Sequence, residues 1–585
     1  MTNLNKSQHN KIDNIRHSLA HLLAAAVRAL YPGAMNAIGP AIKNGFYQDF
    51  ELPKPISQDD LPKIEAKMRE LLPQWTKWTK KVVTLKDVEK EFGWNRYKME
   101  LAKEFARDKK TLTFYTCGGL IDLCKGGHAF ALSEIDPHSF KLDRVAGAYW
   151  RGDEKNKMLT RIYGVAFETK KELDHYLWQQ EEAKKRDHRI LGERLRLFTF
   201  AEEVGPGLPL WLPNGMILRD TIETYAKKIE EEQGYQRVAT PHIAKEKLYK
   251  ISGHIPYYAE SMYPPMELDD GKYYLKAMNC PHTHMIYKSQ PHSYRELPIR
   301  YAEYGTVYRY ELSGTLAGLL RTRGFTQNDA HIYCREDQAE EEFLKVMQLH
   351  EFWYKKVFGI TDFYMRLSLP TKDKKKYAGV PAGWTKAIAL VRNAMKKSGL
   401  PYIETEGEAA FYGPKVDFQI KSVIGREETA STNQLDFVAT ERFGLTYKDR
   451  DGKDKPVYVI HRAPLGSHER FIAFLIEQYA GAFPFWLAPV QVAVLAINEK
   501  VADYAQKVFE ELKKNNIRAE LDLRNESIGK KIREAKLQKI PYLLVIGQKE
   551  VTTQKIAVRE RGLSAQAGKG DIGQKTLEEF LAIAK

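Results

Sequence analysis

The stretch YAEYGTVYRYELSGTLAGLLRTRGFTQNDAHIYC, residues 301–334, decides the fold and carries the most unusual chemistry of the chain. It opens on a run rich in Tyr and Val, residues 302–310, which is typical of a buried strand. A glycine- and arginine-rich arm follows, and then a second strand on which the odd-numbered residues 325–331 share one face. By the same alternation, we expect Arg309 and Glu311 to project from one face of the first strand. The stretch therefore predicts an antiparallel hairpin that gathers arginines, an acid, an aromatic ring and an imidazole.

Such a set suits an anionic nucleotide together with an amine-bearing ligand, because the planar fork of arginine binds phosphate and stacks on bases. The hairpin resembles motif 2 of the class II aminoacyl-tRNA synthetases, and RGFTQNDAHIYC is similar to the threonyl-tRNA synthetase family in particular. GYQRVATP with Pro241 resembles motif 1, and LGSHERF with Arg470 resembles motif 3. The resemblance runs from near residue 13 to the end of the chain.

Length and composition set the outer limits. A chain of 585 residues is too long for one core, so several domains are expected. Lys and Arg outnumber Asp and Glu by 91 to 76, a net charge of +15 that fits a polyanionic partner. Four cysteines in so long a chain make no disulfide framework and favour a reducing cytoplasm. No apolar run approaches the roughly 20 residues of a membrane span, and the polar N-terminus lacks a secretory signal. We therefore expect a cytoplasmic protein that does not enter a membrane.

The predicted fold is multidomain, mixing α+β and α/β units. Residues 1–165 read as an α+β editing domain, and the charged segment 166–195 as one long linker helix. The resemblance implies a class II catalytic domain on an antiparallel sheet at 196–485. After Trp486, strands and helices alternate, which predicts an α/β domain at 486–585 that resembles an anticodon-binding domain.

Two motifs of the first domain are rich in metal-capable and nucleophilic side chains. HSLAH, on an expected helix over 13–30, and IDLCKGGH contribute His17, His21, Asp122, Cys124 and His128. These residue types fit either a zinc site or a hydrolytic pocket. The set resembles the family's editing domain, which removes mischarged serine with water and without a metal, and the resemblance adds Lys98. The family's usual CRGPH is CKGGH here, which puts the stiffness of that loop in question. Many bacterial members begin with a ubiquitin-like domain, and the short polar segment before HSLAH predicts that this chain lacks it.

One cysteine and two histidines on separate motifs predict a three-coordinate zinc, one per chain. They are Cys280 in KAMNCPHTH, His331 in NDAHIYC and His461 in VIHRAPLGS. A metal with open positions can hold the amino and hydroxyl groups of L-threonine. A site that uses a substrate hydroxyl rejects an isostere without it by roughly 10⁴–10⁵, but a missing methyl is worth only about 1–3 kcal/mol. Valine is therefore excluded at the metal, while serine requires editing.

The resemblance implies the remaining roles. ATP is expected on Arg309, Glu311, Arg321, Phe325 and Arg470, with Mg²⁺ bound to its phosphates. Threonine is expected on Asp329, Gln327, Tyr412, Gln434 and Met278. Catalytic roles fall to Arg309, Arg470, Lys415 and His254, the last as a general base near the terminal ribose. Anticodon contacts are expected from Glu550, Arg559 and Arg561, although a solvated basic face fits the two arginines equally well. Where the family has QDDAH and CGT-x-Q, this chain has QNDAH and ASTNQ.

The predicted function is a threonine–tRNA ligase that forms threonyl-adenylate from ATP and passes threonine to the 3′ end of tRNA(Thr). Mischarged Ser-tRNA(Thr) would be hydrolysed in the editing domain, and the family implies a homodimer. A non-catalytic RNA-binding regulator is the alternative from another class, and the intact metal triad and motif arginines argue against it. A synthetase for proline or serine is disfavoured because the triad occurs together with the deacylase-like unit.

Overall fold

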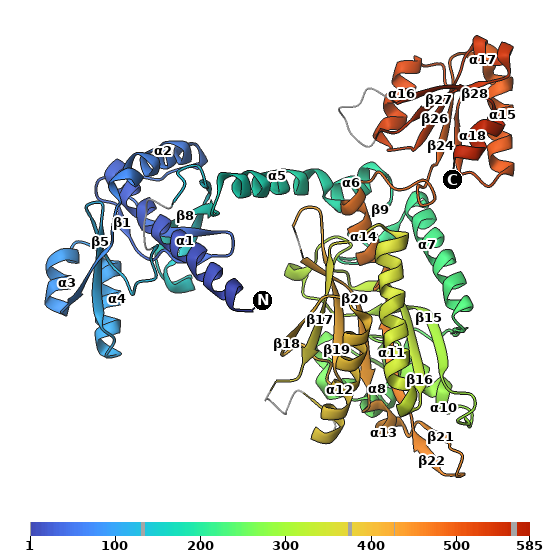
Figure 1. Cartoon of the computed structure of the whole chain (residues 1–585), viewed down its shortest axis with the longest axis horizontal. Coiled ribbons are helices and arrows are strands. Elements are labelled where there is room, and N and C mark those ends of the chain that lie inside the picture. The colour runs from blue at the N-terminus through green and yellow to red at the C-terminus, as the bar shows by residue number, and fades with distance from the viewer. Residues whose placement is uncertain are drawn as a thin grey trace. The chain divides into compact units, whose positions relative to one another are not determined.

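The computed structural model describes residues 2–129, 135–371, 377–378, 380–425, 427–562 and 570–584, with side chains from residue 11 onward. The chain divides into two compact units, residues 1–181 and 182–585 (Figure 1). Among the described residues, no helix has both the length and the apolar character that crossing a bilayer requires.

The first unit is built around one long helix on a sheet. Helix α1 (Thr2–Leu30) begins well before the expected position 13. Its apolar face packs on an antiparallel sheet with the order β1 (Met35–Asn36), β3 (Gly45–Glu51), β8 (Met158–Ala166) and β7 (Phe140–Tyr149), while β2 (Ala41–Ile42) pairs with β3. Leu19, Leu23, Phe46 and Ile162 are fully buried in the shared core, which α2 (Leu61–Leu71) also covers. The α+β prediction is confirmed.

A second, smaller sheet completes this unit. It has the order β4 (Thr79–Val83), β5 (Leu112–Cys117), β6 (Leu120–Leu123). Helices α3 (Leu85–Phe92) and α4 (Arg96–Arg107) are amphipathic, and Val88 and Phe92 of α3 pack with Phe114 of β5. The strand β6 runs directly into the CKGGH loop, so this sheet sets where that loop starts.

The single helix expected over 166–195 is two helices. Helix α5 (Lys170–Arg186) ends before Asp187, and α6 (His188–Arg194) begins after it. The side chain of Asp187 accepts a hydrogen bond of 2.9 Å from the backbone N–H of Arg189, with φ −51° and ψ 117° at Asp187 itself. An N-cap residue adopts non-helical angles, so this cap interrupts the helix that the charge pattern predicted.

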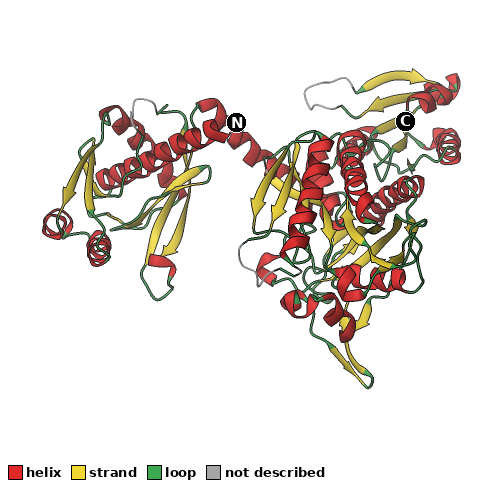
Figure 2. Cartoon of the chain, turned by 60° about the horizontal axis from the view of Figure 1, so that its bottom comes forward, coloured by secondary structure: helices red, strands yellow, loops and turns green. Residues whose placement is uncertain are grey.

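The second unit contains an eight-stranded, mainly antiparallel sheet flanked by long helices (Figure 2). Its order is β11 (Gln236–Arg237), β15 (Ile299–Tyr308), β16 (Gly324–Cys334), β23 (Tyr458–Ala463), β20 (Glu427–Asp436), β19 (Lys415–Lys421), β17 (Phe363–Leu369) and β18 (Tyr402–Glu406). The flanking helices are α7 (Pro213–Glu232), α11 (Glu336–Glu351), α12 (Pro381–Ser398) and α14 (His468–Tyr479). Helix α7 has Pro213 in its first turn.

A small sheet and short helices lie beside the main sheet. The sheet has the order β12 (Ile243–Lys245), β14 (Gly271–Leu275), β13 (Met266–Leu268). The helices are α8 (Glu246–Ser252), α9 (His254–Tyr257), α10 (Cys280–Lys288) and α13 (Ala439–Phe443).

The hairpin of residues 301–334 forms as predicted, with one correction. Strands β15 and β16 pair from Ile299↔Tyr333 to Tyr308↔Gly324. The first strand ends at Tyr308 rather than at position 310, because the backbone N–H of Glu311 bonds to the carbonyl of Arg309 at 2.9 Å and turns the chain. The expectation that Arg309 and Glu311 share a strand face is therefore wrong.

The C-terminal part is the predicted α/β layer. Its sheet has the order β25 (Ala519–Asp522), β24 (Val492–Ala496), β26 (Tyr542–Ile546), β27 (Ile556–Glu560), β28 (Asp571–Lys575), and the first three strands are parallel. Helices α15 (Ala502–Lys514), α16 (Ile528–Leu537), α17 (Gln548–Thr553) and α18 (Leu577–Ile583) complete it.

Candidate active site and a second polar pocket

The predicted metal ligands come together although they are far apart in the sequence. Cys280 begins α10, while His331 on β16 lies directly opposite His461 on β23. Their ligand atoms all lie within 4.8 Å of one another, and all three residues are buried. A strand pair and a helix N-terminus thus build one cluster of a thiol and two imidazoles.

The chemistry of this cluster fits a zinc ion. The Nε2 atom of His331 is buried without a hydrogen-bond partner in the structure. Burial, reinforced by Asp329 and Asp436, raises the pKa of the Cys280 thiol well above its usual value. A bound zinc would supply the positive charge that ionises such a thiol and the partner that such an imidazole lacks.

A second donor set, His284, Asp436 and His461, overlaps the first. Asp436 accepts a hydrogen bond of 3.0 Å from Nε2 of His461, and its other oxygen accepts two backbone N–H groups at 2.7 and 2.8 Å. His284 is bonded through Nδ1 to the hydroxyl of Tyr333 at 2.9 Å. Since a metal-binding histidine commonly bonds to a carboxylate behind it, Asp436 is better placed to orient His461 than to bind the metal.

The predicted ATP residues line one cavity of about 280 Å³. Its lining includes Arg309, Arg321, Arg470, Phe325, Glu311, Gln327, Gln434 and Lys415. The guanidinium of Arg309 lies 5.0 Å from the centre of the Phe325 ring, and Arg321 pairs with Glu311 at 2.9 Å. Burial, together with the charges of Arg309 and Arg321, lowers the pKa of Arg470. Three arginines and one lysine lining the same cavity suit a polyphosphate.

Three of the residues predicted for threonine, Asp329, Tyr412 and Gln434, lie beside the metal cluster. Asp329 accepts a hydrogen bond of 3.1 Å from the amide of Asn279, and burial raises the pKa of its carboxyl group. The Tyr412 hydroxyl bonds to the side-chain oxygen of Gln434, and its ring stacks on His461 with centroids 5.0 Å apart. A buried acid beside the cluster is suited to an ammonium group, because a positive ligand favours its charged form.

The environment of His254 does not favour the predicted role as a general base. The side chain is only 2% exposed, with Nδ1 2.8 Å from the hydroxyl of Ser252 and Nε2 2.7 Å from Sδ of Met278. Burial and the charge of Arg309 lower the pKa of His254 to about 3. An efficient general base has a pKa near the working pH, so this neutral imidazole is a better hydrogen-bonding group than a base.

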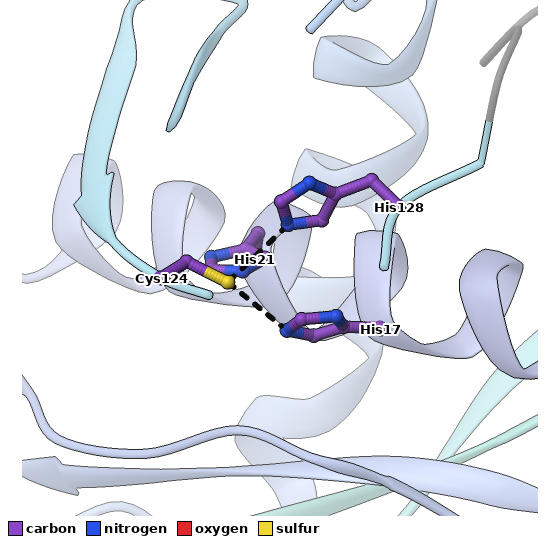
Figure 3. A group of neighbouring side chains, drawn as sticks. All are labelled: His17, His21, Cys124 and His128. Carbon is purple, nitrogen blue, oxygen red and sulfur yellow. Dashed lines mark hydrogen bonds between the residues drawn. The ribbon is translucent and has the colours of Figure 1, made fainter. Parts of the chain in front are cut away.

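The second polar pocket gathers all six residues predicted for editing. His17 and His21 lie on α1, Lys98 on α4, Asp122 on β6, and Cys124 and His128 on the loop that follows. Figure 3 shows His17 and His128 turned toward the sulfur of Cys124; the Nε2 atom of each lies 3.5 Å from Sγ. The ligand atoms of the three histidines and Cys124 lie within 4.8 Å of one another.

A buried carboxylate holds this pocket together. Asp122, 1% exposed, accepts from Lys98 at 2.6 Å, from Nδ1 of His21 at 2.9 Å and from Asn36 at 3.2 Å. Although burial opposes its charged form, hydrogen bonds to Asp122 and Cys124 raise the pKa of His21 to about 9. Burial likewise opposes the thiolate of Cys124, but hydrogen bonds from the three histidines lower its pKa to about 3. The pocket therefore favours a thiolate beside a protonated imidazole.

Comparisons with known proteins match three stretches of the chain to families. Residues 112–163 match the threonyl and alanyl tRNA synthetase second additional domain, 263–479 the class II core domain (G, H, P, S and T), and 491–584 an anticodon binding domain. The threonine–tRNA ligase of Deinococcus radiodurans is 48% identical over 553 residues, covering 93% of this chain and 85% of the relative. That of Thermus thermophilus is 46% identical over 585 residues, covering 97% and 87%.

The chain belongs to the threonyl-tRNA synthetase family. The predicted family, fold class and threonine–tRNA ligase activity are thereby confirmed. Among solved structures, the RNA binding domain of threonyl-tRNA synthetase from Cryptosporidium parvum is 36% identical with a TM-score of 0.64, covering 68% of this chain and 97% of that one. A putative threonyl-tRNA synthetase from Aeropyrum pernix is 30% identical with a TM-score of 0.60, covering 68% and 94%.

Two aromatic residues that line the editing pocket of this synthetase, Trp78 and Tyr115, could not be recognised from the sequence. The ring of Trp78 stacks on His128 with centroids 4.0 Å apart and planes 15° apart, and Tyr115 meets the same imidazole edge-on at 4.6 Å. Tyr115 lies on β5 and Trp78 immediately before β4, and neither belongs to a motif. An aromatic residue read from sequence is more often core than site, so no signal distinguished them.

Two of the three predicted anticodon residues are engaged inside the synthetase. Arg561 donates to the carbonyls of Ala482 and Phe483 at 3.2 and 2.5 Å. Glu550, 8% exposed, accepts from the backbone N–H of Gly547 at 3.0 Å and from the Gln574 amide at 2.6 Å. These bonds favour structural roles and leave Arg559 as the better placed of the three predicted contacts.

Proposed function

We propose that the cavity and the metal cluster of unit 2 together carry threonine activation and transfer to tRNA(Thr). The observation that carries this proposal is the convergence of Cys280, His331 and His461 beside an arginine-lined pocket. Zinc bound to these three ligands would act as a Lewis acid that anchors the amino and hydroxyl groups of threonine. Valine would then be rejected because it lacks the hydroxyl group that threonine offers to the metal.

The chain's own residues position the two reactants. Arg309 binds the α-phosphate, and Arg321 binds the outer phosphates once it exchanges Glu311 for them. Adenine lies between Phe325 and Arg470, and Mg²⁺ bound with ATP would neutralise the charge that develops on the phosphates. Asp329 binds the ammonium group, while Tyr412 and Gln434 close the amino-acid side. Threonine's carboxylate is thereby aimed at the α-phosphorus, and pyrophosphate leaves.

We infer that the pocket of unit 1 hydrolyses Ser-tRNA(Thr). Asp122 fixes Lys98 and His21, and His17 and His128 face the sulfur of Cys124. Water held by these groups attacks the ester carbonyl and gives its proton to a pocket base. The leaving 3′ oxygen of the tRNA takes a proton from a protonated imidazole. The donor atoms of His17, His21, Cys124 and His128 also suit zinc, so a zinc site is the second candidate for this pocket.

The remaining partners follow from the family. The basic net charge of +15 and the C-terminal domain support binding of tRNA, and the motif 1 resemblance around Pro241 supports a homodimer.

Amino-acid-dependent exchange of pyrophosphate into ATP tests the activation step. Across the twenty amino acids, threonine should drive the strongest exchange, and C280S should abolish it because one of three ligands is lost. C124A is the matched control, since it removes a thiol from the other unit and should exchange like the wild type. Exchange driven by proline instead of threonine would overturn the substrate assignment.

A further inference from the structure

Helix α7 faces the sheet with two acids that no motif includes. Glu223 and Glu230 are seven positions apart and therefore share one side of the helix. Glu223 lies 3.2 Å from Nε2 of His468, at the start of α14. Glu230 is 3% exposed and makes a denser set of contacts.

Glu230 joins two strands of the sheet. Its Oε1 atom accepts from Nη2 of Arg462 on β23 at 2.8 Å and from the amide of Asn328 on β16 at 2.9 Å. Arg462 is 0% exposed, and its guanidinium lies 4.3 Å from the centre of the Tyr235 ring. The side-chain oxygen of Asn328 also accepts a hydrogen bond of 3.4 Å from Nη1 of Arg462. Carboxylate, amide and guanidinium thus form one buried network.

This network lies directly behind the active site. Arg462 follows the metal ligand His461, and Asn328 precedes Asp329. Because successive side chains of a strand point to opposite faces, the two rear groups occupy the same levels of the sheet as the two site groups. The register Ala330↔Arg462 and His331↔His461 keeps β16 and β23 locked at this point.

We propose that Glu230 is a positioning residue of the threonine site. It neutralises a buried arginine that would otherwise carry an unpaired charge, and it ties that arginine to the strand that holds Asp329. Displacements on the order of 1 Å at a reacting centre are costly, so the spacing of the two strands matters for the amino acid. This inference rests on the function proposed for unit 2 and adds to it a residue outside the three motifs.

The amide of Asn328 is matched to this arrangement. It donates to Glu230 and accepts from Arg462, so an acid at position 328 would face the carboxylate of Glu230 without the donated hydrogen bond. If position 230 were uncharged, however, the same acid would supply the counter-charge for Arg462. The N328D substitution should therefore harm the wild type and rescue E230Q.

Four full-length variants test the proposal by pyrophosphate exchange with threonine and ATP varied in turn. E230Q should raise the KM for threonine, by up to about 100-fold, as a displacement of about 1 Å at a reacting centre does, with a smaller change for ATP. N328D alone should be impaired, and E230Q/N328D should return most of the threonine affinity. Zinc content and Tm are measured on each preparation. E223Q is the matched control, because its partner His468 belongs to motif 3, two positions before Arg470, so that its effect should fall on ATP.

Several results would overturn the inference. An unchanged KM for threonine in E230Q, or a lowered Tm with both KM values intact, assigns Glu230 to stability alone. If E230Q does not fold, E230Q/N328D decides, since its failure to fold or to bind threonine contradicts the network. A wild-type chain that activates no threonine would instead refute the proposed function itself.

Discussion

Cys124 differs from the other cysteines of the chain at the level of the single side chain. Cys117, Cys280 and Cys334 are buried, whereas Cys124 is half-buried and faces three imidazoles. Its pKa is lowered to about 3 because hydrogen bonds from these rings outweigh the effect of burial. A group with a depressed pKa is ionised at every pH above that value and protonates only as the pH falls through it.

Alkylation of Cys124 by iodoacetamide should therefore be selective and nearly independent of pH between about pH 5 and pH 8. An ordinary thiol would lose about tenfold in rate for each unit below its pKa of about 8.5. Mass spectrometry of the full chain measures the rate, and H128A is the control, because losing one partner should restore part of the pH dependence. A tenfold fall per unit in the wild type would contradict the thiolate, and labelling that starts only after chelation would indicate a metal on this donor set.

Residues carried by motifs could be placed from the sequence, and residues defined by tertiary packing could not. Cys280, His331 and His461 each stand in a motif, and strand alternation correctly put Asp329 and His331 on one face. Glu230 lies on an ordinary amphipathic helix and Trp78 just before a strand, and both acquire their roles only through partners far away in the chain.

The same distinction holds for whole elements. The α/β layer of the C-terminal domain could be predicted because buried parallel strands are apolar throughout and alternate with amphipathic helices. The break at Asp187 and the early end of β15 could not be predicted, because each depends on one local hydrogen bond that competes with the regular pattern.

The CKGGH loop has its own geometry. Gly126 and Gly127 adopt φ values of +99° and +89°, which L-residues with side chains rarely adopt. The carbonyl of Gly127 accepts a hydrogen bond of 3.0 Å from Nδ1 of His17, and a Cβ at Gly126 would lie 2.5 Å from the hydroxyl of Tyr115. The loop therefore fixes His128 through a conformation that the family's usual proline cannot share, since proline holds φ near about −65°.

Restoring the family's residue by G127P should damage editing. Deacylation of Ser-tRNA(Thr) should fall by about 100-fold because His128 is displaced, while threonine activation in unit 2 stays intact. G127A is the control: its Cβ would lie 3.5 Å from Oδ1 of Asn14, an ordinary contact, so it isolates the backbone strain of about 1–2 kcal/mol. Wild-type deacylation by G127P would show that the loop does not require this conformation.

At the scale of the whole molecule, the two sites belong to separately packed units. The core around Leu19 and Phe46 contains only residues of unit 1, and the core around Leu218 and Ile460 only residues of unit 2. Each site therefore has its own supporting structure, and a substitution in one is expected to leave the other working.

A reciprocal pair of variants tests this independence. C280S should lose the zinc, near one per wild-type chain, together with threonine activation, yet still deacylate Ser-tRNA(Thr). C124A should keep the metal and the activation and accumulate Ser-tRNA(Thr), as should H21A. Metal analysis and the two assays are run on the same preparations. Two metals per wild-type chain, one of them absent from C124A, would show that the editing donors bind metal as well.

The hairpin of β15 and β16 also constrains how this chain can change over generations. Asp329 and His331 both point into the site because they lie two positions apart on one strand. Asn328 and Ala330, which alternate with them, point to the opposite face of the sheet. Losing or gaining one codon between Phe325 and His331 would send the front side chains backward and bring the rear ones forward. Only insertions or deletions of an even number of residues preserve this alternation. The length of this stretch is therefore constrained more strictly than the identity of its individual residues.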